Sequence, residues 1–190
     1  MSKIVDHSAQ RENILARSYE LFAREGYAAI TLRRLSKELG VSTGALYHYF
    51  DSKEEIFEQT VAYIARMELS AAVAVVTASK TREERLQSLT QFLLKRDEQL
   101  RLLLMLIFDV ARQNSELAQS GIFVRALDTY VEAIVLNLPE IPREDARFAV
   151  DMLLGAIVRR MLIQRDDDFV AHVAWLAEFA DADREKNDAS

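Results

Sequence analysis

Three ring-bearing side chains follow one another at Tyr47, His48 and Tyr49, just after the small polar segment 42–45. Helical spacing places residues three or four apart on one face, so three consecutive rings cannot all enter a core. A tyrosine offers a flat ring to a thymine methyl group and a hydroxyl group to a phosphate oxygen. The chemistry that these side chains offer is therefore contact with a nucleic acid.

The elements around these rings form a helix-turn-helix pattern. Thr31 is expected to cap a short helix that Gly40 ends, and Ser42 is expected to cap a second one that ends near Phe50. The small residues that begin the second helix let its backbone approach a major groove. Leu46 and Phe50 are four apart and are expected to anchor its inner face.

Lys53 falls in the first turn of the helix that follows. A cation is unfavourable at a helix N-terminus, which indicates a further reason for its presence. We interpret Lys53 as a phosphate contact.

The segment "ITLRRLSKELGVSTGALYHYFDSKEEIF", residues 30–57, resembles the signature of the TetR family (TetR/AcrR-type) of bacterial transcriptional regulators. The resemblance covers roughly the first sixty residues; beyond them it extends only to length and helicity. Where a common form of the family has histidine, this chain has Tyr49. The DNA contacts that the resemblance implies are Thr31, Arg33, Ser42, Thr43, Gly44, Ala45, Tyr47, Tyr49 and Lys53.

Composition points to an all-α fold. Half of the 190 residues are hydrophobic, while Pro (2) and Gly (5) are scarce, which suits long helices. The absence of cysteine excludes disulfides and thiolate metal sites, and the three histidines are far apart in sequence, so we expect no metal. Residues 1–10 carry no apolar segment, and the longest apolar run, 102–108, is too short for a bilayer, so we expect a cytoplasmic protein.

Charge is distributed unevenly. The net charge is −6, but residues 1–50 contain 7 Lys+Arg and 5 Asp+Glu, whereas residues 51–190 contain 17 and 25. A mildly basic first part fits an end that approaches a polyanion, and a random fluctuation explains it as readily.

Helical patterning continues along the chain. We expect a first helix over 8–25 ended by Gly26, and capping boxes at Ser52–Glu55 and Thr81–Glu84. The further helices expected are 52–78, 99–113, 115–138, 142–165 and 167–183. We divide the chain into a helix-turn-helix DNA-binding domain (1–51) and a helical regulatory and dimerisation domain (52–190), connected by the helix 52–78.

A single short recognition helix reads too few base pairs for useful specificity, so we expect a homodimer. The resemblance implies that the last two helices pair with those of a second subunit, although an internal core is an equally good reading of each helix alone. The predicted interface residues are Met152, Gly155, Ala156, Arg159, Phe169, Val173, Leu176 and Ala177.

The middle helices are rich in Leu, Met and Phe, which suit either a core or the lining of an apolar pocket. The resemblance implies a small-molecule effector pocket there, with Asp109 or Arg112 as polar contacts. The predicted lining is Phe92, Leu103, Met105, Phe108, Asp109, Arg112, Phe123 and Tyr130.

The function expected is therefore a repressor that binds a palindromic double-stranded DNA operator as a dimer and leaves it when an apolar or amphipathic effector binds. An activator or a protein-binding adaptor is the alternative. A helical-bundle enzyme is disfavoured, because the sequence has no HExxH, no glycine-rich phosphate loop and no cysteine. Asp109 and Arg112 lie within an apolar segment and fit either a catalytic pair or a structural ion pair. No cofactor is expected.

Overall fold

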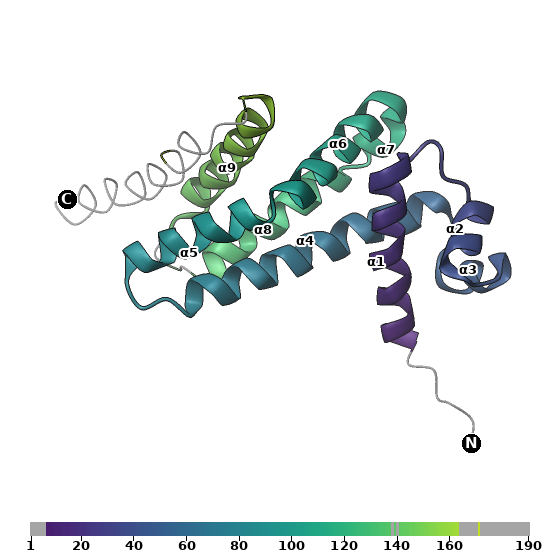
Figure 1. Cartoon of the computed structure of the whole chain (residues 1–190), viewed down its shortest axis with the longest axis horizontal. Coiled ribbons are helices and arrows are strands. Elements are labelled where there is room, and N and C mark those ends of the chain that lie inside the picture. The colour runs from purple at the N-terminus through teal and green to yellow at the C-terminus, as the bar shows by residue number, and fades with distance from the viewer. Residues whose placement is uncertain (1–6, 138, 140, 164–170, 172–190) are drawn as a thin grey trace, which may run out of the picture. The chain divides into compact units, whose positions relative to one another are not determined.

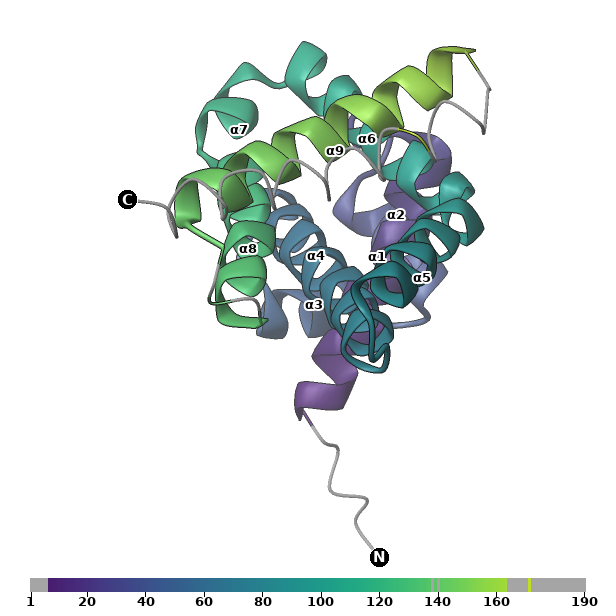
Figure 2. The same cartoon turned by 90° about the vertical axis from the view of Figure 1, so that its left-hand side faces the viewer.

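The computed structural model describes residues 7–137, 139, 141–163 and 171, and in that part of the chain every regular element is a helix (Figures 1 and 2). The all-α prediction is confirmed. The helices are α1 (His7–Glu25), α2 (Leu32–Leu39), α3 (Thr43–Tyr49), α4 (Lys53–Thr77), α5 (Arg82–Lys95), α6 (Asp97–Gln113), α7 (Ser115–Gln119), α8 (Ile122–Asn137) and α9 (Arg143–Ile163).

The ends of the first three helices follow local rules. Gly26 ends α1 with a φ of 81°, and Gly40 ends α2 with a φ of 71°, a conformation that glycine adopts without strain. The side chains of Thr31 and Ser42 accept hydrogen bonds from the backbone of the first turns of α2 and α3. These caps place α2, the turn and α3 where the sequence predicts them.

The two predicted capping boxes differ in the structure. At the start of α5, Thr81 and Glu84 exchange both hydrogen bonds, as predicted. At the start of α4, Ser52 accepts from the Glu55 N–H at 3.0 Å, but the Glu55 carboxylate accepts from the N–H of Asp51, one residue before the cap. The prediction of a reciprocal pair at Ser52 is therefore half right.

The helix predicted over 115–138 is interrupted. The short α7 ends before Gly121, whose φ of 79° is left-handed, and α8 then begins at Ile122. This glycine was overlooked as a stop signal because the apolar pattern continues on both sides of it. The helix predicted over 167–183 lies outside the described residues.

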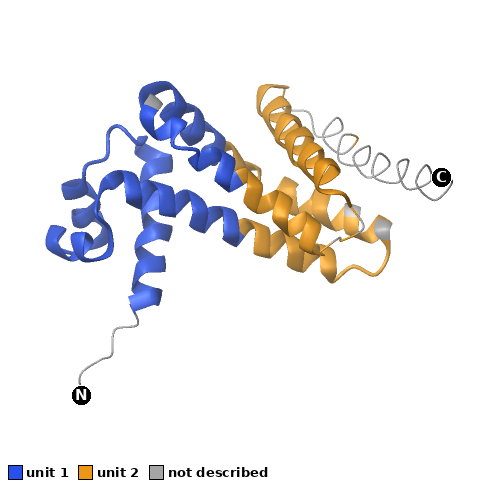
Figure 3. Ribbon diagram, turned by 180° about the vertical axis from the view of Figure 1, so that it is seen from behind, with its two compact units in different colours: residues 1–67, 102–126 blue, residues 68–101, 127–190 orange. Residues whose placement is uncertain are grey.

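Packing divides the chain into two compact units (Figure 3). The first comprises residues 1–67 and 102–126, and the second comprises 68–101 and 127–190. Packing units are not the same as functional domains, so the division at residue 51 into DNA-binding and regulatory parts stays a prediction. The helix-turn-helix nevertheless packs in one unit with the second half of α6, with α7 and with the start of α8.

The core of the first unit is built around three aromatic rings. The Phe22 and Phe57 ring centroids lie 5.4 Å apart and nearly perpendicular, and Tyr27 lies 4.9 Å from Phe57. Phe22 and Phe57 are fully buried, and Leu106 and Val110 of α6 belong to the same cluster. The core thus connects the helix-turn-helix to the second half of α6.

The second unit has a smaller apolar cluster around Val131, Ala146 and Val150. An ion pair joins its helices as well: Arg160, which is 14% exposed, lies 3.0 Å from Asp97. This ion pair therefore contributes to the packing of the second unit, together with the apolar cluster.

The helix α4 is long and apolar enough to cross a membrane by length and composition, with a mean hydropathy of 1.4 in its most apolar 18-residue window. Only 17% of that window is buried. The longest uninterrupted apolar run, 102–108, does not reveal this property of α4. In α4 the apolar residues are interrupted by charged side chains, so the helix contains no long apolar run. A single helix of this kind is weak evidence for a membrane protein, because core helices pass the same test.

The aromatic core provides a first test. We expect Phe57→Ala to lower the free energy of unfolding by about 3–5 kcal/mol, because it removes both edge contacts and leaves a cavity. The matched control is Phe108→Ala, whose ring is 55% exposed and whose loss should change stability by only about 0.5 kcal/mol. Urea denaturation followed by circular dichroism measures both. Equal destabilisation of the two variants would contradict the assignment of Phe57 to the core.

Candidate nucleic-acid interface

The short helix α3 has a buried and an exposed face. The Ser42 hydroxyl group accepts from the Ala45 N–H at 3.0 Å, which fixes the start of the helix. Leu46 is 1% exposed and anchors the inner face, whereas the next residue, Tyr47, is 53% exposed. Gly44 lies on the exposed side, and a methyl group added there would meet nothing closer than the Ser42 hydroxyl oxygen at 3.9 Å. The leading end of α3 is therefore open to an approaching surface.

The three consecutive rings divide between these faces. Tyr47 and His48 are exposed, and Tyr49 is half-buried against the first unit's core. The Tyr49 hydroxyl group lies 3.3 Å from His7 Nδ1 at the start of α1. The expectation that Tyr47 points outward agrees with this arrangement, while Tyr49 presents only part of its ring.

The predicted contacts on α2 also differ in availability. Thr31 is exposed, but its hydroxyl group already accepts from the Arg34 N–H at 3.1 Å. Arg33 is exposed. Arg34 forms ion pairs with Glu25 at 3.2 Å and with an acid one turn further along α2. Arg33 is therefore the more available of these two arginines for a contact with DNA.

Contacts between α2 and α3 fix the angle at which α3 is presented. The Thr43 hydroxyl group lies 3.2 Å from that of Ser36, which is buried in α2. Arg17 of α1 donates to the carbonyl oxygen of Leu39 at 2.8 Å and also to that of Glu38. The guanidinium thus satisfies carbonyl groups at the end of α2 that have no partner within the helix. Sequence spacing gave no signal for this role of Arg17, because the partners are backbone atoms far along the chain.

Lys53 is directed toward the loop before α2. Its ammonium group donates to the carbonyl oxygens of Tyr27 (3.2 Å) and Ile30 (3.0 Å) and lies 4.0 Å from the centre of the Tyr27 ring. The Tyr27 hydroxyl group in turn donates to Glu54 at 2.8 Å. This answers why a cation begins α4, since it braces the loop that leads to the helix-turn-helix. A phosphate contact by the remaining N–H stays a prediction.

Burial and hydrogen bonding shift the pKa values of this group of residues. Desolvation lowers the pKa of Lys53, against the raising effect of Glu54. Burial, reinforced by the bond to Glu54, raises the pKa of the Tyr27 hydroxyl group well above its usual value. The pKa of Glu54 is lowered, first by its own backbone N–H and then by Tyr27. At neutral pH, Tyr27 is therefore a neutral donor to an ionised Glu54.

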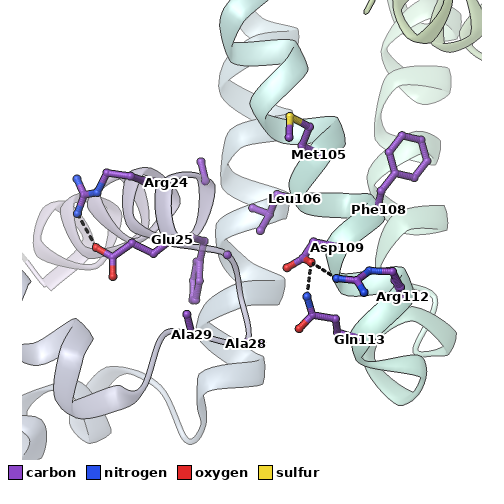
Figure 4. Close-up of a pocket in the computed structure, with 13 residues that line it drawn as sticks. Arg24, Glu25, Ala28, Ala29, Met105, Leu106, Phe108, Asp109, Arg112 and Gln113 are labelled. Atoms are coloured by element: carbon purple, nitrogen blue, oxygen red, sulfur yellow. Dashed lines mark hydrogen bonds and ion pairs between the residues drawn. The ribbon is translucent and has the colours of Figure 1, made fainter. Parts of the chain in front are cut away.

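The predicted pocket residues do not form one site. Met105, Phe108, Asp109 and Arg112 line an open groove of about 600 Å³ within the first unit (Figure 4). Leu103 does not line it. Phe123 packs on the first unit's core, and Phe92 and Tyr130 belong to the second unit.

Two of these side chains differ from expectation in exposure. Arg112 and Asp109 form the ion pair considered from the sequence, at 3.4 Å, but Arg112 is 76% exposed, so the pair lies at the surface and is not buried in the apolar helix. Phe108 is likewise mostly exposed instead of filling a core. The groove is therefore a surface feature of α6.

The predicted interface residues on α9 lie on different faces. Gly155 and Arg159 are exposed, and Met152 is half-buried, whereas Ala156 is buried at 6% exposed. Ala156 is therefore not available to a partner. The other predicted residues, Phe169, Val173, Leu176 and Ala177, lie outside the described residues.

The histidines are closer than their sequence positions suggest. The ring centroids of His7 and His48 lie 5.9 Å apart, and both side chains are exposed. In the part of the chain that the structure describes, no group of three potential metal ligands occurs. The third histidine, His172, lies outside that part.

Comparison with known proteins agrees with this geometry. The sequence profile described as "Bacterial regulatory proteins, tetR family" matches residues 14–60. The chain is 35% identical over 88 residues to the nucleoid occlusion factor SlmA of Vibrio vulnificus, covering 46% of this chain and 45% of that protein. It is 42% identical over 50 residues to the transcriptional repressor AcnR of Corynebacterium diphtheriae, covering 26% of each. The chain thus spans less than half the length of the curated relatives it matches.

The fold extends further than the sequence similarity. A TetR transcription regulator from Haloarcula marismortui superposes with a TM-score of 0.65 and 24% identity, covering 92% of this chain and 98% of that one. The capped α2–turn–α3 geometry is a helix-turn-helix within an all-α fold. Residues 14–60 match the tetR family of bacterial regulatory proteins, and the fold of the chain is similar to that of the Haloarcula marismortui regulator.

The position of Lys53 provides a test. We expect Lys53→Ala to lower the free energy of unfolding by about 1–2 kcal/mol, because two hydrogen bonds from a charged donor are lost. DNA affinity should fall alike for all sequences, because the loop before α2 loses its brace. Unfolding curves and fluorescence anisotropy at several salt concentrations measure the two effects.

The salt dependence separates the two roles of Lys53. A slope of log affinity against log salt that falls by about 1 per subunit would add a phosphate contact to the brace. Unchanged stability would contradict the bracing role. The control is Lys37→Ala, which removes an exposed lysine from α2.

Proposed function

We propose that the chain is a cytoplasmic repressor that binds a palindromic DNA operator as a homodimer and leaves it when an apolar or amphipathic small molecule binds. The observation that carries the proposal is the exposed leading end of α3, with Tyr47 outward and Leu46 buried. A recognition helix meets the major groove with its N-terminal residues, and those of α3 are small. The mildly basic first fifty residues favour the same partner.

A homodimer supplies the second recognition helix. Two copies of α3 would have to be about 34 Å apart to enter successive major grooves. One face of α9 supports pairing: Gly155 is exposed, no atom of the described residues lies within 4 Å of a Cβ built there, and Leu162 is 80% exposed. Residues 155 and 162 are seven apart and therefore share this face. Glycine allows a second helix to approach closely.

Release from DNA requires that the effector binds one conformation better than the other. A differential affinity worth about 1–3 kcal/mol changes operator affinity by roughly 5–150-fold. The continuous helix α4 begins at the Lys53 brace and passes into the second packing unit. A tilt of α4 is one route by which effector binding reaches the helix-turn-helix.

An activator, or an adaptor that acts through a protein partner, is the alternative. The match to nucleoid occlusion factors covers 88 residues and so reaches beyond the helix-turn-helix. A reporter gene placed behind the selected operator distinguishes these roles. Lower expression with the protein present supports a repressor, and higher expression supports an activator. Unchanged expression at an operator that the protein occupies supports an adaptor.

The role of Tyr47 in DNA binding can be tested directly. An operator is first selected from a random duplex library with the unaltered protein. We expect Tyr47→Ala to abolish specific binding, because each lost contact contributes about 1–3 kcal/mol and a dimer loses two. Fluorescence anisotropy with the selected duplex and with a scrambled one measures the specificity.

Two controls accompany this measurement. Tyr47→Phe keeps the ring and removes only the hydroxyl group, so it separates base stacking from phosphate bonding. Circular dichroism of each variant checks the fold, since Tyr47 is exposed and its loss should leave the helices intact. Operator affinity that is unchanged in a folded Tyr47→Ala protein would refute the proposal.

Dimerisation through α9 is tested with Gly155→Glu. A Cβ has open space at this position, so the protomer should keep its fold, while a charged side chain blocks close approach of a second helix. We expect sedimentation to show a monomer and operator affinity to fall at least about tenfold, since each protomer reads only half a site. The matched control is Gly155→Ala, because a methyl group leaves more room than a glutamate side chain for a second helix to approach. A Gly155→Glu protein that remains a dimer would exclude this face.

A further inference from the structure

We propose that the groove between the end of α1 and α6 is a binding site for an amphipathic carboxylate, and that filling it weakens DNA binding. The groove has a volume of about 600 Å³, within the range of small-molecule sites. This inference rests on the effector-responsive part of the proposed function. It names the place and the chemistry of the ligand.

The apolar side of the groove comes from α6 and from the residues after Gly26. Met105 and Phe108 are 59% and 55% exposed, although both are large and apolar. Ala28 and Ala29, in the loop after Gly26, line the same groove and are also exposed (Figure 4). Leu106 also lines the groove, but it is only 4% exposed and belongs to the first unit's core. The apolar surface in the groove is thus additional to the surface that the fold needs.

The charged groups in the groove are unequally available. The acids are the less exposed partners: Glu25 is 28% exposed and Asp109 is 27% exposed. Glu25 accepts from Arg24 at 2.9 Å and from Arg34 at 3.2 Å, and Asp109 accepts from Arg112 and from the adjacent Gln113. Both carboxylates therefore have partners already.

The arginines, by contrast, face solvent. Arg112 is 76% exposed, and its contact with Asp109 is long at 3.4 Å. Arg24 is 61% exposed. A guanidinium has five N–H donors and binds a carboxylate through two of them. The groove consequently fits a ligand whose negative end reaches Arg112 and whose apolar body lies on Phe108 and Met105.

The groove adjoins the contact between the first helix and α6. A Cβ built on Gly26 would lie 3.2 Å from Asp109 Oδ2, so backbone and side chain meet closely there. Gly26 is followed by the loop that Lys53 braces and that leads to Thr31 at the start of α2. A ligand in the groove contacts both the loop and α6, so it favours the conformation in which their spacing suits it best. Because the loop and α6 belong to one core, a change in their spacing reaches α2 through that core.

The test uses the full-length protein and three ten-carbon probes: decanoate, decanol and decyltrimethylammonium. Isothermal titration calorimetry without DNA reads the site alone. We expect decanoate to bind once per protomer, and about tenfold more tightly than the other two probes, because only it gains a charge-assisted bond. No binding of decanoate, or equal binding of the cationic probe, would overturn the proposal.

Variants locate the site. Arg112→Glu and Phe108→Ala should each weaken decanoate binding about tenfold. The matched controls are Arg147→Glu, an exposed arginine of α9, and Met67→Ala, an apolar side chain of similar exposure, and both should bind decanoate normally. Equal affinities in all four variants would place the ligand elsewhere and overturn the assignment.

Release from DNA is measured separately by anisotropy on the selected operator. Decanoate should lower the affinity of the unaltered protein and leave that of Arg112→Glu unchanged. If decanoate fills the groove in calorimetry and operator affinity does not move, the coupling is refuted while the DNA-binding function stands. If no duplex is bound specifically, the proposed function fails while calorimetry still reports on the groove.

Discussion

The arrangement of this chain depends on the burial of one cluster of rings. Phe22, Tyr27 and Phe57 come from α1, the following loop and α4, and their edges and faces meet in the core of the first unit. Val110 of α6 is fully buried in the same cluster. Interiors are close-packed, so a shift of any of these helices must move the others. The helix-turn-helix is thereby connected physically to a helix that is distant in sequence.

Polar contacts around this core fix the direction in which α3 is presented. Lys53 donates to two carbonyl groups of the loop before α2, and Arg17 donates to two carbonyl groups at the C-terminal end of α2. Each guanidinium or ammonium group satisfies acceptors that would otherwise lack partners, and so these bonds specify position as well as stability. An interface that reads DNA needs its small residues placed accurately, and α3 itself is too short to fix its own orientation.

The parts that were predictable from sequence are those fixed by local rules. The caps at Thr31 and Ser42 and the left-handed Gly26 and Gly40 depend on neighbouring residues only, and they were predicted correctly. The long-range partners of Lys53 were not predictable, because a lysine that braces carbonyl groups and one that contacts a phosphate have the same local sequence. The pairing of α6 with the end of α1 carries no periodic signal either.

The exposed apolar surface of α6 follows from how that helix is used. Its buried side, with Leu106 and Val110, is needed for the core, so Met105 and Phe108 are not required for folding. Large apolar side chains on a surface carry a solvation cost and commonly mark a binding site. Here they line the same groove as Gly26, where the loop to the helix-turn-helix begins. A ligand held on this surface contacts both α6 and that loop, so its binding energy acts directly on the element that positions α3.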